Sequence, residues 1–247
     1  MSNSLRLLIN GSRGRMGQAL VHCAASFPEL SVAAEVDAGD DFNAALAHCD
    51  AVIDFSHHAT LDGVLALCVE NKRTLVIGTT GHSDAQIAAI HEAGKSIPIV
   101  FAPNYSVGVN TLFWLTRKAT EILGPSFDLE VVEMHHRMKI DAPSGTAYLL
   151  GEAAATGRNI ALEHHSIRSR DGETGKRPEG SIGFATLRGG TVIGDHSVIF
   201  AGNGERITLS HHAEDRSLFA SGALKAAVWS KGQPVGLYSM MDVLGLS

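Results

Sequence analysis

Cysteine is scarce in this chain, and its arrangement excludes two kinds of site. Only three of the 247 residues are cysteines, Cys23, Cys49 and Cys68, and no C-x-x-C pair is present. An odd number without paired spacing indicates neither a disulfide framework nor a cysteine-based zinc site. The 13 histidines include adjacent pairs but no H-x-x-x-H spacing, so we expect no metal. Free, buried cysteines fit a reducing compartment, and we expect a cytoplasmic protein.

Long apolar runs and an excess of positive charge are also missing. No run approaches the roughly 18 apolar residues that a membrane-spanning helix needs. The apolar run near the N-terminus, Leu7–Ile9, is too short for a signal-peptide core. The formal net charge of −6 gives no electrostatic footprint for nucleic acid or an anionic membrane. We therefore expect a small molecule as partner, and an anionic one must be held by local groups.

Alternating strand and helix patterns with short connections fill residues 5–104. The strands are short apolar runs without alternation, which is typical of a parallel sheet covered on both faces. Crossovers in such sheets are right-handed, which gives a doubly wound α/β domain of the Rossmann type. The strand patterns cover residues 5–10, 32–36, 51–55, 74–77 and 97–101, and the helical patterns cover 16–27, 42–49, 61–70 and 84–93.

A different pattern follows Asn104. Two helical stretches, 107–123 and 146–154, accompany four strand candidates joined by glycine-rich turns. Strands gathered in this way imply a mixed or antiparallel sheet in a second, α+β domain. The polar segment 171–180 is expected to be a mobile loop, and a last helix, 218–231, could belong to either domain. The strand candidates are residues 129–134, 181–188, 197–201 and 206–211.

A glycine-rich loop joins the first strand to the first helix. It reads Gly11-Ser12-Arg13-Gly14-Arg15-Met16-Gly17. Glycines permit a tight turn and let the backbone approach a pyrophosphate at a helix N-terminus. A purely structural turn would also explain the glycines, but Asp37 ends the second strand 20 residues after Gly17. An acidic residue at that place binds adenosine ribose hydroxyls, so we expect a nicotinamide dinucleotide.

Charged residues near this loop point to both forms of the cofactor. Asp37 favours NADH, because a carboxylate repels a 2′-phosphate, whereas Arg13 and Arg15 could pair with that phosphate. We therefore expect NADH and NADPH both to be accepted. Two further strand ends carry small polar clusters that should flank the nicotinamide half. These clusters are Gly78-Thr79-Thr80-Gly81 and Ala102-Pro103-Asn104-Tyr105.

The segment 133–147 combines proton donors with a place for an anion. His135, His136 and Lys139 carry side chains that can give a proton near neutral pH. In a strand, Glu133 and His135 share one face and His136 lies on the other, so the two histidines should have different tasks. Pro143 suits a helix start, whose free N–H groups hold carboxylates. These N–H groups belong to Ser144, Gly145 and Thr146.

Simpler explanations exist for each part of this segment. A single histidine is more often a structural or surface residue than a catalyst, and Ser-Gly-Thr could be only a helix cap. The combination with a dinucleotide loop about a hundred residues earlier favours the catalytic interpretation. A hydride from the cofactor places negative charge on the substrate, which a cationic His135 or Lys139 could meet with a proton.

These motifs together resemble the bacterial dihydrodipicolinate reductase family over nearly the whole chain. The most specific part is E-x-H-H-x-x-K-x-D-A-P-S-G-T-A from Glu133 to Ala147, which shows no departure from the family pattern. The other matching segments are Gly11–Gly17, Val76–Gly81, Ala102–Asn110, Arg188–Gly190 and Gly194–Phe200. One departure is the short segment between Asp37 and Ala51, which leaves open what contacts a 2′-phosphate.

The resemblance implies an enzyme that reduces a cyclic imine dicarboxylate with NADH or NADPH in the diaminopimelate route to lysine. It implies a cofactor domain of residues 1–106 and 217–247, a substrate-binding and oligomerisation domain of residues 107–216, and a homotetramer. It makes His135 the proton donor or acceptor and Lys139 the proton donor. His136 and the Gly145-Thr146 backbone bind substrate. The implied cofactor contacts are Gly11–Met16, Asp37, Gly78–Thr80 and Ala102–Tyr105.

Two alternatives remain open at this point. One is a related nicotinamide-dependent reductase of another small dicarboxylate, which a panel of substrates would distinguish. The other is a nucleotide-sensing protein that keeps the fold without catalysis. The intact set of His135, His136 and Lys139 argues against the second alternative.

Overall fold

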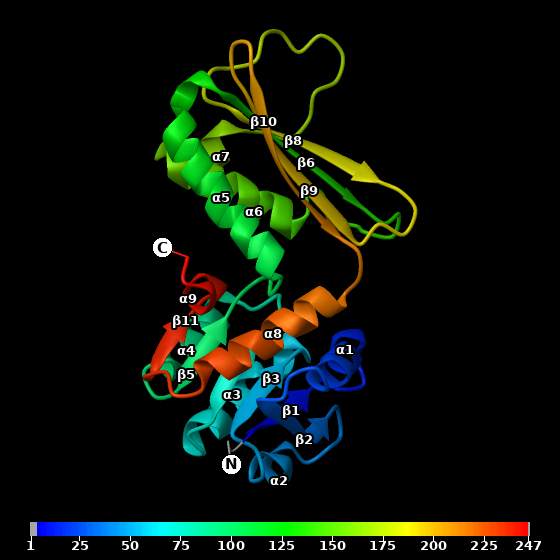
Figure 1. Cartoon of the computed structure of the whole chain (residues 1–247), viewed down its shortest axis with the longest axis vertical. Coiled ribbons are helices and arrows are strands. Elements are labelled where there is room, and N and C mark those ends of the chain that lie inside the picture. Colours follow the sequence, from blue (N-terminus) through cyan, green and yellow to red (C-terminus); the bar gives the residue numbers. More distant parts are fainter. Residues whose placement is uncertain (1–3, 247) are drawn as a thin grey trace. The chain divides into compact units, whose positions relative to one another are not determined.

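The computed structural model describes residues 4–246, which form two compact units (Figure 1). Unit 1 runs to Val107 and resumes at Arg216, whereas unit 2 comprises Gly108–Asp215. The domains expected from the sequence change at 106/107 and 216/217, one residue from each of these boundaries. No helix within residues 4–246 is long and apolar enough to cross a membrane.

Unit 1 is built on a six-stranded sheet in which every recorded pairing is parallel. The strand order is β11-β5-β4-β3-β1-β2. The predicted doubly wound parallel sheet is therefore confirmed, and β11 adds an edge strand that the sequence did not reveal. The strands are β1 (Leu5–Asn10), β2 (Leu30–Val36), β3 (Ala51–Asp54), β4 (Thr74–Ile77), β5 (Pro98–Phe101) and β11 (Gly236–Tyr238).

Helices cover both faces of this sheet, which explains why its strands lack alternation. Successive residues of β1 enter different cores: Leu7 and Ile9 pack in one cluster and Leu8 packs in the other. The last long helix, which the sequence left unassigned, contributes Ala223 and Leu224 to the first cluster and so belongs to unit 1. The helices are α1 (Arg15–Ala24), α2 (Phe42–Leu46), η1 (His58–Thr60), α3 (Leu61–Glu70), α4 (Asp84–Ala93), α8 (Ser217–Ser230) and α9 (Met240–Leu244).

Unit 2 contains a five-stranded mixed sheet in the order β10-β9-β6-β8-β7. The central strand β6 pairs parallel with β8 and antiparallel with β9. Buried and partly buried residues alternate along β6 and β9, because helices cover one face only. The strands are β6 (Asp128–His135), β7 (Ser166–Ile167), β8 (Ile182–Arg188), β9 (Gly194–Ala201) and β10 (Arg206–Ala213). The helices are α5 (Val107–Leu123), η2 (Gly124–Ser126), α6 (Gly145–Arg158) and α7 (Leu162–His165).

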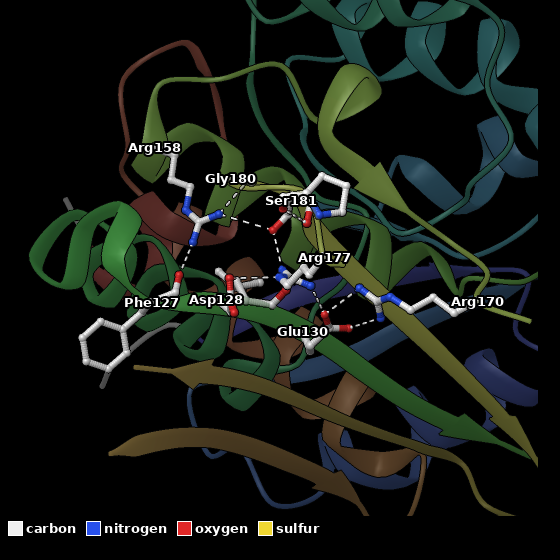
Figure 2. Close-up of polar contacts among 10 residues, drawn as sticks. Phe127, Asp128, Glu130, Arg158, Arg170, Arg177, Gly180 and Ser181 are labelled. Atoms are coloured by element: carbon white, nitrogen blue, oxygen red, sulfur yellow. Dashed lines mark hydrogen bonds and ion pairs between the residues drawn. The ribbon is translucent and has the colours of Figure 1, made fainter. Parts of the chain in front are cut away.

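Arginines fix both ends of the polar loop 171–180 that was expected to be mobile (Figure 2). Arg170 donates two hydrogen bonds of 2.8 and 2.9 Å to the carboxylate of Glu130, and Arg177 pairs with the same carboxylate. Arg158, at the end of α6, donates to the carbonyl of Gly180 at 3.0 Å. The loop is exposed along most of its length but is anchored to the first half of β6.

Candidate active site

The glycine-rich loop of unit 1 has a backbone that only glycine allows at two positions. Gly11 has a φ of +82°, and a Cβ added there would lie 2.5 Å from the carbonyl oxygen of Phe55. A Cβ on Gly17 would lie 2.1 Å from the carbonyl oxygen of Gly11. No side chain caps the N-terminus of α1, which begins at Arg15. Its first backbone N–H groups are therefore suited to an anion.

A cavity of about 650 Å³ lies beside this loop. It is bounded by the loop itself, by the turn after β2 and by apolar side chains of α3, including Val64 and Leu67. Of the residues predicted to contact the cofactor, it brings together Gly11, Arg13, Gly14 and Asp37. A polar rim with an apolar floor suits a nucleoside, with the base on the floor and the ribose at the rim.

Asp37 presents a carboxylate at the end of β2. Its two oxygens accept hydrogen bonds of 2.8 Å from the backbone N–H groups of Ala38 and Arg13. These two bonds, that of Ala38 first, lower the pKa of the side chain below its usual value. The group is therefore ionised at neutral pH and accepts further hydrogen bonds from hydroxyl groups.

A second cavity, of about 560 Å³, is lined in part by the predicted loop after β4. It is lined by Arg15 and Met16 at the start of α1 and by Gly78, Thr79 and Thr80 after β4. A Cβ on Gly78 would lie 2.1 Å from the ring of Phe55, so glycine is required where the loop passes this ring. Several further residues line this cavity that no motif in the sequence had indicated. These are Phe55, Ser56, His57, His58 and Arg216.

The buried carboxylate of Asp54 is hydrogen-bonded to residues at the ends of three strands. It accepts hydrogen bonds of 2.7 Å from Asn10, 2.6 Å from Ser56 and 2.9 Å from Thr79. These residues follow or end β1, β3 and β4. The general rule that ligands bind at the carboxyl ends of parallel strands could have singled them out from sequence.

The predicted residues Ala102, Pro103, Asn104 and Tyr105 line neither cavity. Tyr105 is buried, and its hydroxyl lies 2.8 Å from the carbonyl oxygen of Ile77 and 2.9 Å from that of Val100. Burial raises the pKa of this hydroxyl well above its usual value. Tyr105 therefore fixes the loop after β5 to the ends of two strands, and a direct cofactor contact by this segment stays a prediction.

In unit 2, Glu133 and His135 lie on the buried face of β6, as their spacing predicts. The Nδ1 atom of His135 lies 2.5 Å from Oε2 of Glu133. Arg188 of β8 donates to both oxygens of the same carboxylate, at 2.8 and 3.0 Å. The backbone N–H of Ser144 adds a hydrogen bond of 3.0 Å. Glu133 therefore holds the catalytic candidate, the end of β8 and the start of α6 in one network.

The pKa shifts in this network indicate the protonation states of Glu133 and His135. Burial raises the pKa of Glu133, but hydrogen bonds from Arg188, His135 and Ser144 more than offset it, so the pKa is lowered. Burial lowers the pKa of His135, and the nearby cations Lys139 and Arg188 add to this effect against the influence of Glu133. His135 is therefore neutral at neutral pH. With its Nδ1–H directed to Glu133, its Nε2 is a hydrogen-bond acceptor.

Lys139 follows β6 in the turn toward α6. Its Nζ lies 2.9 Å from Oδ1 of Asp141, and the lysine side chain is 22% exposed. The hydrogen bond from Lys139 lowers the pKa of Asp141 despite some burial. His136 lies just beyond the strand, where its backbone N–H donates to the carbonyl of Val192 at 2.7 Å. The two histidines are thus separated in role, because only His135 belongs to the buried network.

The start of α6 is open on the side where an anion would bind. Ser144 caps the helix by accepting a hydrogen bond of 3.1 Å from the N–H of Ala147. A Cβ on Gly145 would meet nothing within 4 Å, so a ligand can approach its backbone. Thr146 follows in the first turn of this 14-residue helix. The predicted anion site therefore lies at a helix N-terminus, but of its three residues Ser144 has its N–H already bound to Glu133, which leaves Gly145 and Thr146 as the candidates.

His196 of β9 is a member of this network that the sequence did not assign. It is 3% exposed, its ring packs edge-on to that of His135 at 5.1 Å, and its Nε2 lies 3.2 Å from Oγ of Ser144. Burial, with the neighbouring His135, lowers the pKa of His196 to about 4. In the sequence, His196 stood out only as part of the segment Gly194–Phe200, and this segment does not indicate which residues His196 contacts.

His196 makes the stability of the fold pH-dependent. The unfolded chain takes up a proton at this histidine near the ordinary pKa of 6.5, whereas the folded chain does so only near 4. The contribution of His196 is complete above pH 6.5 and is lost as the pH falls toward 4, by about 3 kcal/mol. Urea unfolding at several pH values should show this loss, and His196→Phe should make it smaller. An unchanged slope in that variant would contradict the assignment.

No group of three or more His, Cys, Asp or Glu side chains in residues 4–246 is arranged to hold a metal ion. Unit 1 contains a cavity beside a helix N-terminus, and unit 2 contains a buried histidine, an ammonium and a second helix N-terminus.

Comparison with known proteins covers both units. The family model described as dihydrodipicolinate reductase, N-terminus, matches residues 5–105, and that described as dihydrodipicolinate reductase, C-terminus, matches residues 108–244. A protein of Akkermansia muciniphila named 4-hydroxy-tetrahydrodipicolinate reductase is 53% identical over 98% of this chain and 99% of its own length. A protein of the same name from Methylocella silvestris is 49% identical over 98% of this chain and 97% of its own length.

Solved structures show the same fold at lower identity. The dipicolinate-bound dihydrodipicolinate reductase from Paenisporosarcina sp. TG-14 is 24% identical, with a TM-score of 0.78 over 97% of this chain and 99% of that one. GenD2 from gentamicin A biosynthesis, in complex with NAD, is 14% identical, with a TM-score of 0.59 over 100% of this chain and 92% of that one.

Proposed function

The chain belongs to the dihydrodipicolinate reductase family, and we propose that it is a 4-hydroxy-tetrahydrodipicolinate reductase. Such an enzyme reduces a cyclic imine dicarboxylate to tetrahydrodipicolinate with a nicotinamide cofactor, in the diaminopimelate route to lysine. The observation that carries the proposal is the 53% identity to a reductase of that name over nearly the full length of both chains. The two cavities and the His135–Glu133 network supply the parts that this reaction needs.

We propose that unit 1 holds the cofactor, which supplies the hydride when bound. The close backbone approach at Gly11 and Gly17 and the uncapped start of α1 fit a pyrophosphate. The floor of the first cavity fits the adenine, and Asp37 fits the ribose hydroxyls. Ser12, Arg15 and Met16 complete the loop, with Gly78–Thr80 and Ala102–Tyr105 toward the nicotinamide.

The finer proposal is that NADH is preferred to NADPH. Asp37 is ionised at neutral pH because two backbone N–H groups stabilise its charge. A carboxylate at the ribose accepts hydrogen bonds from two hydroxyls but repels a 2′-phosphate, which carries a charge of about −2. Both cofactors are still expected to be accepted, with a higher affinity for NADH.

We propose that unit 2 supplies the proton and binds the dicarboxylate. Lys139 is the proton donor, because its ammonium can release a proton that the guanidinium of Arg188 cannot, while His135 is neutral. The Nε2 of His135 accepts a hydrogen bond and positions the substrate, so it serves as acceptor rather than as donor. The start of α6 at Gly145 and Thr146, with His136, binds a carboxylate of the substrate, and Ser144 caps this helix while its own N–H donates to Glu133.

We further propose a cytoplasmic homotetramer assembled through unit 2. Strand β10 lies at the edge of the mixed sheet with its Ile207 38% exposed, and Leu187 of β8 in the same sheet is 51% exposed. An exposed edge strand with apolar side chains is a ready surface for another copy of the chain. The molar mass in solution would show whether four copies assemble.

The experiment that tests this function follows the absorbance of the reduced nicotinamide. With a freshly prepared cyclic imine dicarboxylate, NADH should be oxidised in proportion to substrate, with a lower KM than NADPH. Binding of NADH without any substrate-dependent oxidation would instead indicate a nucleotide-sensing protein. Oxidation with another small dicarboxylate only would indicate a related reductase.

A further inference from the structure

Arg13 and Asp40 form an ion pair at the rim of the adenosine cavity, and the proposed function gives this pair no role. We infer that Asp40 is a specificity-determining residue, which occupies Arg13 and so withholds it from the 2′-phosphate of NADPH. The inference rests on the proposed function, because it assumes that the cavity takes the adenosine ribose of a nicotinamide cofactor. It adds a residue that belongs to neither the glycine loop nor the end of β2.

The turn after β2 fixes the carboxylate of Asp40. The N–H of Asp40 donates to the carbonyl of Asp37 at 3.0 Å, and Gly39 between them has a φ of +92°, which glycine adopts readily. In return, the N–H of Asp37 donates to Oδ2 of Asp40 at 2.9 Å. The side chain of Asp40 is therefore directed by its own turn rather than by a ligand.

This carboxylate lies against the guanidinium of Arg13. The Nη2 atom of Arg13 lies 3.0 Å from Oδ1 and 2.7 Å from Oδ2 of Asp40. The backbone N–H of the same arginine donates to Asp37 at 2.8 Å. Arg13, Asp37 and Asp40 thus form one contiguous group, and a ribose bound to Asp37 would place its 2′ substituent beside the other two.

The charges of Arg13, Asp37 and Asp40 determine whether a 2′-hydroxyl or a 2′-phosphate binds more favourably beside them. Arg13 is the only arginine or lysine among the described residues that line the cavity. Arginine is the side chain best suited to a phosphate, but here its charge is matched by Asp40, and Asp37 adds a second carboxylate. A 2′-phosphate would face two negative groups and would have to displace Asp40 from Arg13, the one guanidinium among the described residues that line this cavity. A ribose hydroxyl faces no such cost.

The test is the substitution Asp40→Asn, which removes the charge and keeps the size of the side chain. An amide oxygen can still accept from the N–H of Asp37, so the turn is preserved. Calorimetry on the full-length protein would measure the affinities for NADH, NADPH, 5′-AMP and 2′,5′-ADP. We expect Asp40→Asn to tighten binding of NADPH and 2′,5′-ADP about tenfold, with little change for NADH and 5′-AMP.

Two further variants make the result specific. Arg13→Ala in the Asp40→Asn protein should abolish the gain for 2′,5′-ADP, because the freed guanidinium provides it. Asp41→Asn removes the same charge from the neighbouring residue, which caps α2 by accepting from the N–H of Ala44 at 3.0 Å. This control should leave the ratio of the two cofactor affinities unchanged.

The outcomes separate the inference from the function on which it rests. An unchanged ratio in Asp40→Asn, an equal gain in Asp41→Asn, or a gain that survives Arg13→Ala would overturn the role of Asp40 while leaving the reductase intact. A wild-type chain that binds neither NADH nor NADPH would overturn the proposed function itself.

Discussion

Replacing Lys139 with alanine is expected to lower kcat by about 10²–10⁴-fold, the range that a positioned general acid contributes. The ammonium of Lys139 is held 2.9 Å from Asp141, and burial with nearby cations lowers the pKa of His135, which makes the imidazole the weaker proton donor of the two at neutral pH. NADH affinity should be nearly unchanged, because the residues that line the two proposed cofactor cavities belong to unit 1. Single-turnover rates and NADH binding would measure the two effects separately.

Two companion variants show what the lysine contributes. Lys139→Arg keeps the positive charge, but a guanidinium does not release a proton near neutral pH, so kcat should remain low while the KM for the dicarboxylate recovers. Lys176→Ala removes an exposed lysine from the loop of the same unit and should leave both constants unchanged. Wild-type turnover in Lys139→Ala would remove this residue from the role of proton donor.

The architecture of unit 1 could be predicted because each of its main strands and helices leaves a recognisable pattern within a short stretch of sequence. The inner strands β1, β3 and β4 are buried along almost their whole length and therefore appear as continuous apolar runs, and each helix follows within a short connection. The sequence analysis overlooked the edge strand β11, which has only three residues, all partly buried. Its existence depends on pairing with β5 in register from Gly236 to Tyr238, which leaves no pattern in the sequence.

The surroundings of the candidate catalytic residues in unit 2 could be predicted only in part. Strand alternation correctly placed Glu133 and His135 on one face, because that relation is a property of a single strand. Arg188 and His196 come from β8 and β9, which flank β6 on its two sides. Their approach depends on registers that pair His135 with Arg188 and Glu133 with His196. The neutral state of His135 follows from this burial and was therefore out of reach of the sequence.

At the proposed cofactor site, too, the spacing of residues along the sequence could be predicted, whereas side-chain contacts that depend on the direction of a turn could not. The glycine loop and Asp37 were predicted from spacing along one strand–helix–strand unit. Arg13 was recognised as a possible partner of a 2′-phosphate, but its pairing with Asp40 depends on the direction of the turn after β2. A carboxylate three residues from Asp37 can point to either side of such a turn, so sequence alone did not settle the charge that a phosphate would meet.

Replacing Glu133 with glutamine is expected to lower kcat about 10²-fold and to destabilise the fold by about 3 kcal/mol. The carboxylate accepts from His135, from both terminal nitrogens of Arg188 and from the N–H of Ser144, whereas an amide nitrogen cannot accept from any of them. Glu133 acts through His135 and is a positioning residue. Because its charge raises the pKa of His135, the variant should move the acidic limb of the pH–rate profile to lower pH.

Glu130→Gln is the matched control for this position. Glu130 lies on the same strand and is also bound by two arginines, Arg170 and Arg177, but it is remote from His135 in the network. Its loss should cost stability at the loop anchor and leave kcat and the pH–rate profile unchanged. Glu133→Asp, which retains the charge, should restore the position of the acidic limb even where turnover is incomplete. If Glu130→Gln and Glu133→Gln shifted the profile equally, the effect of Glu133 would be general destabilisation, and its role in orienting His135 would be refuted.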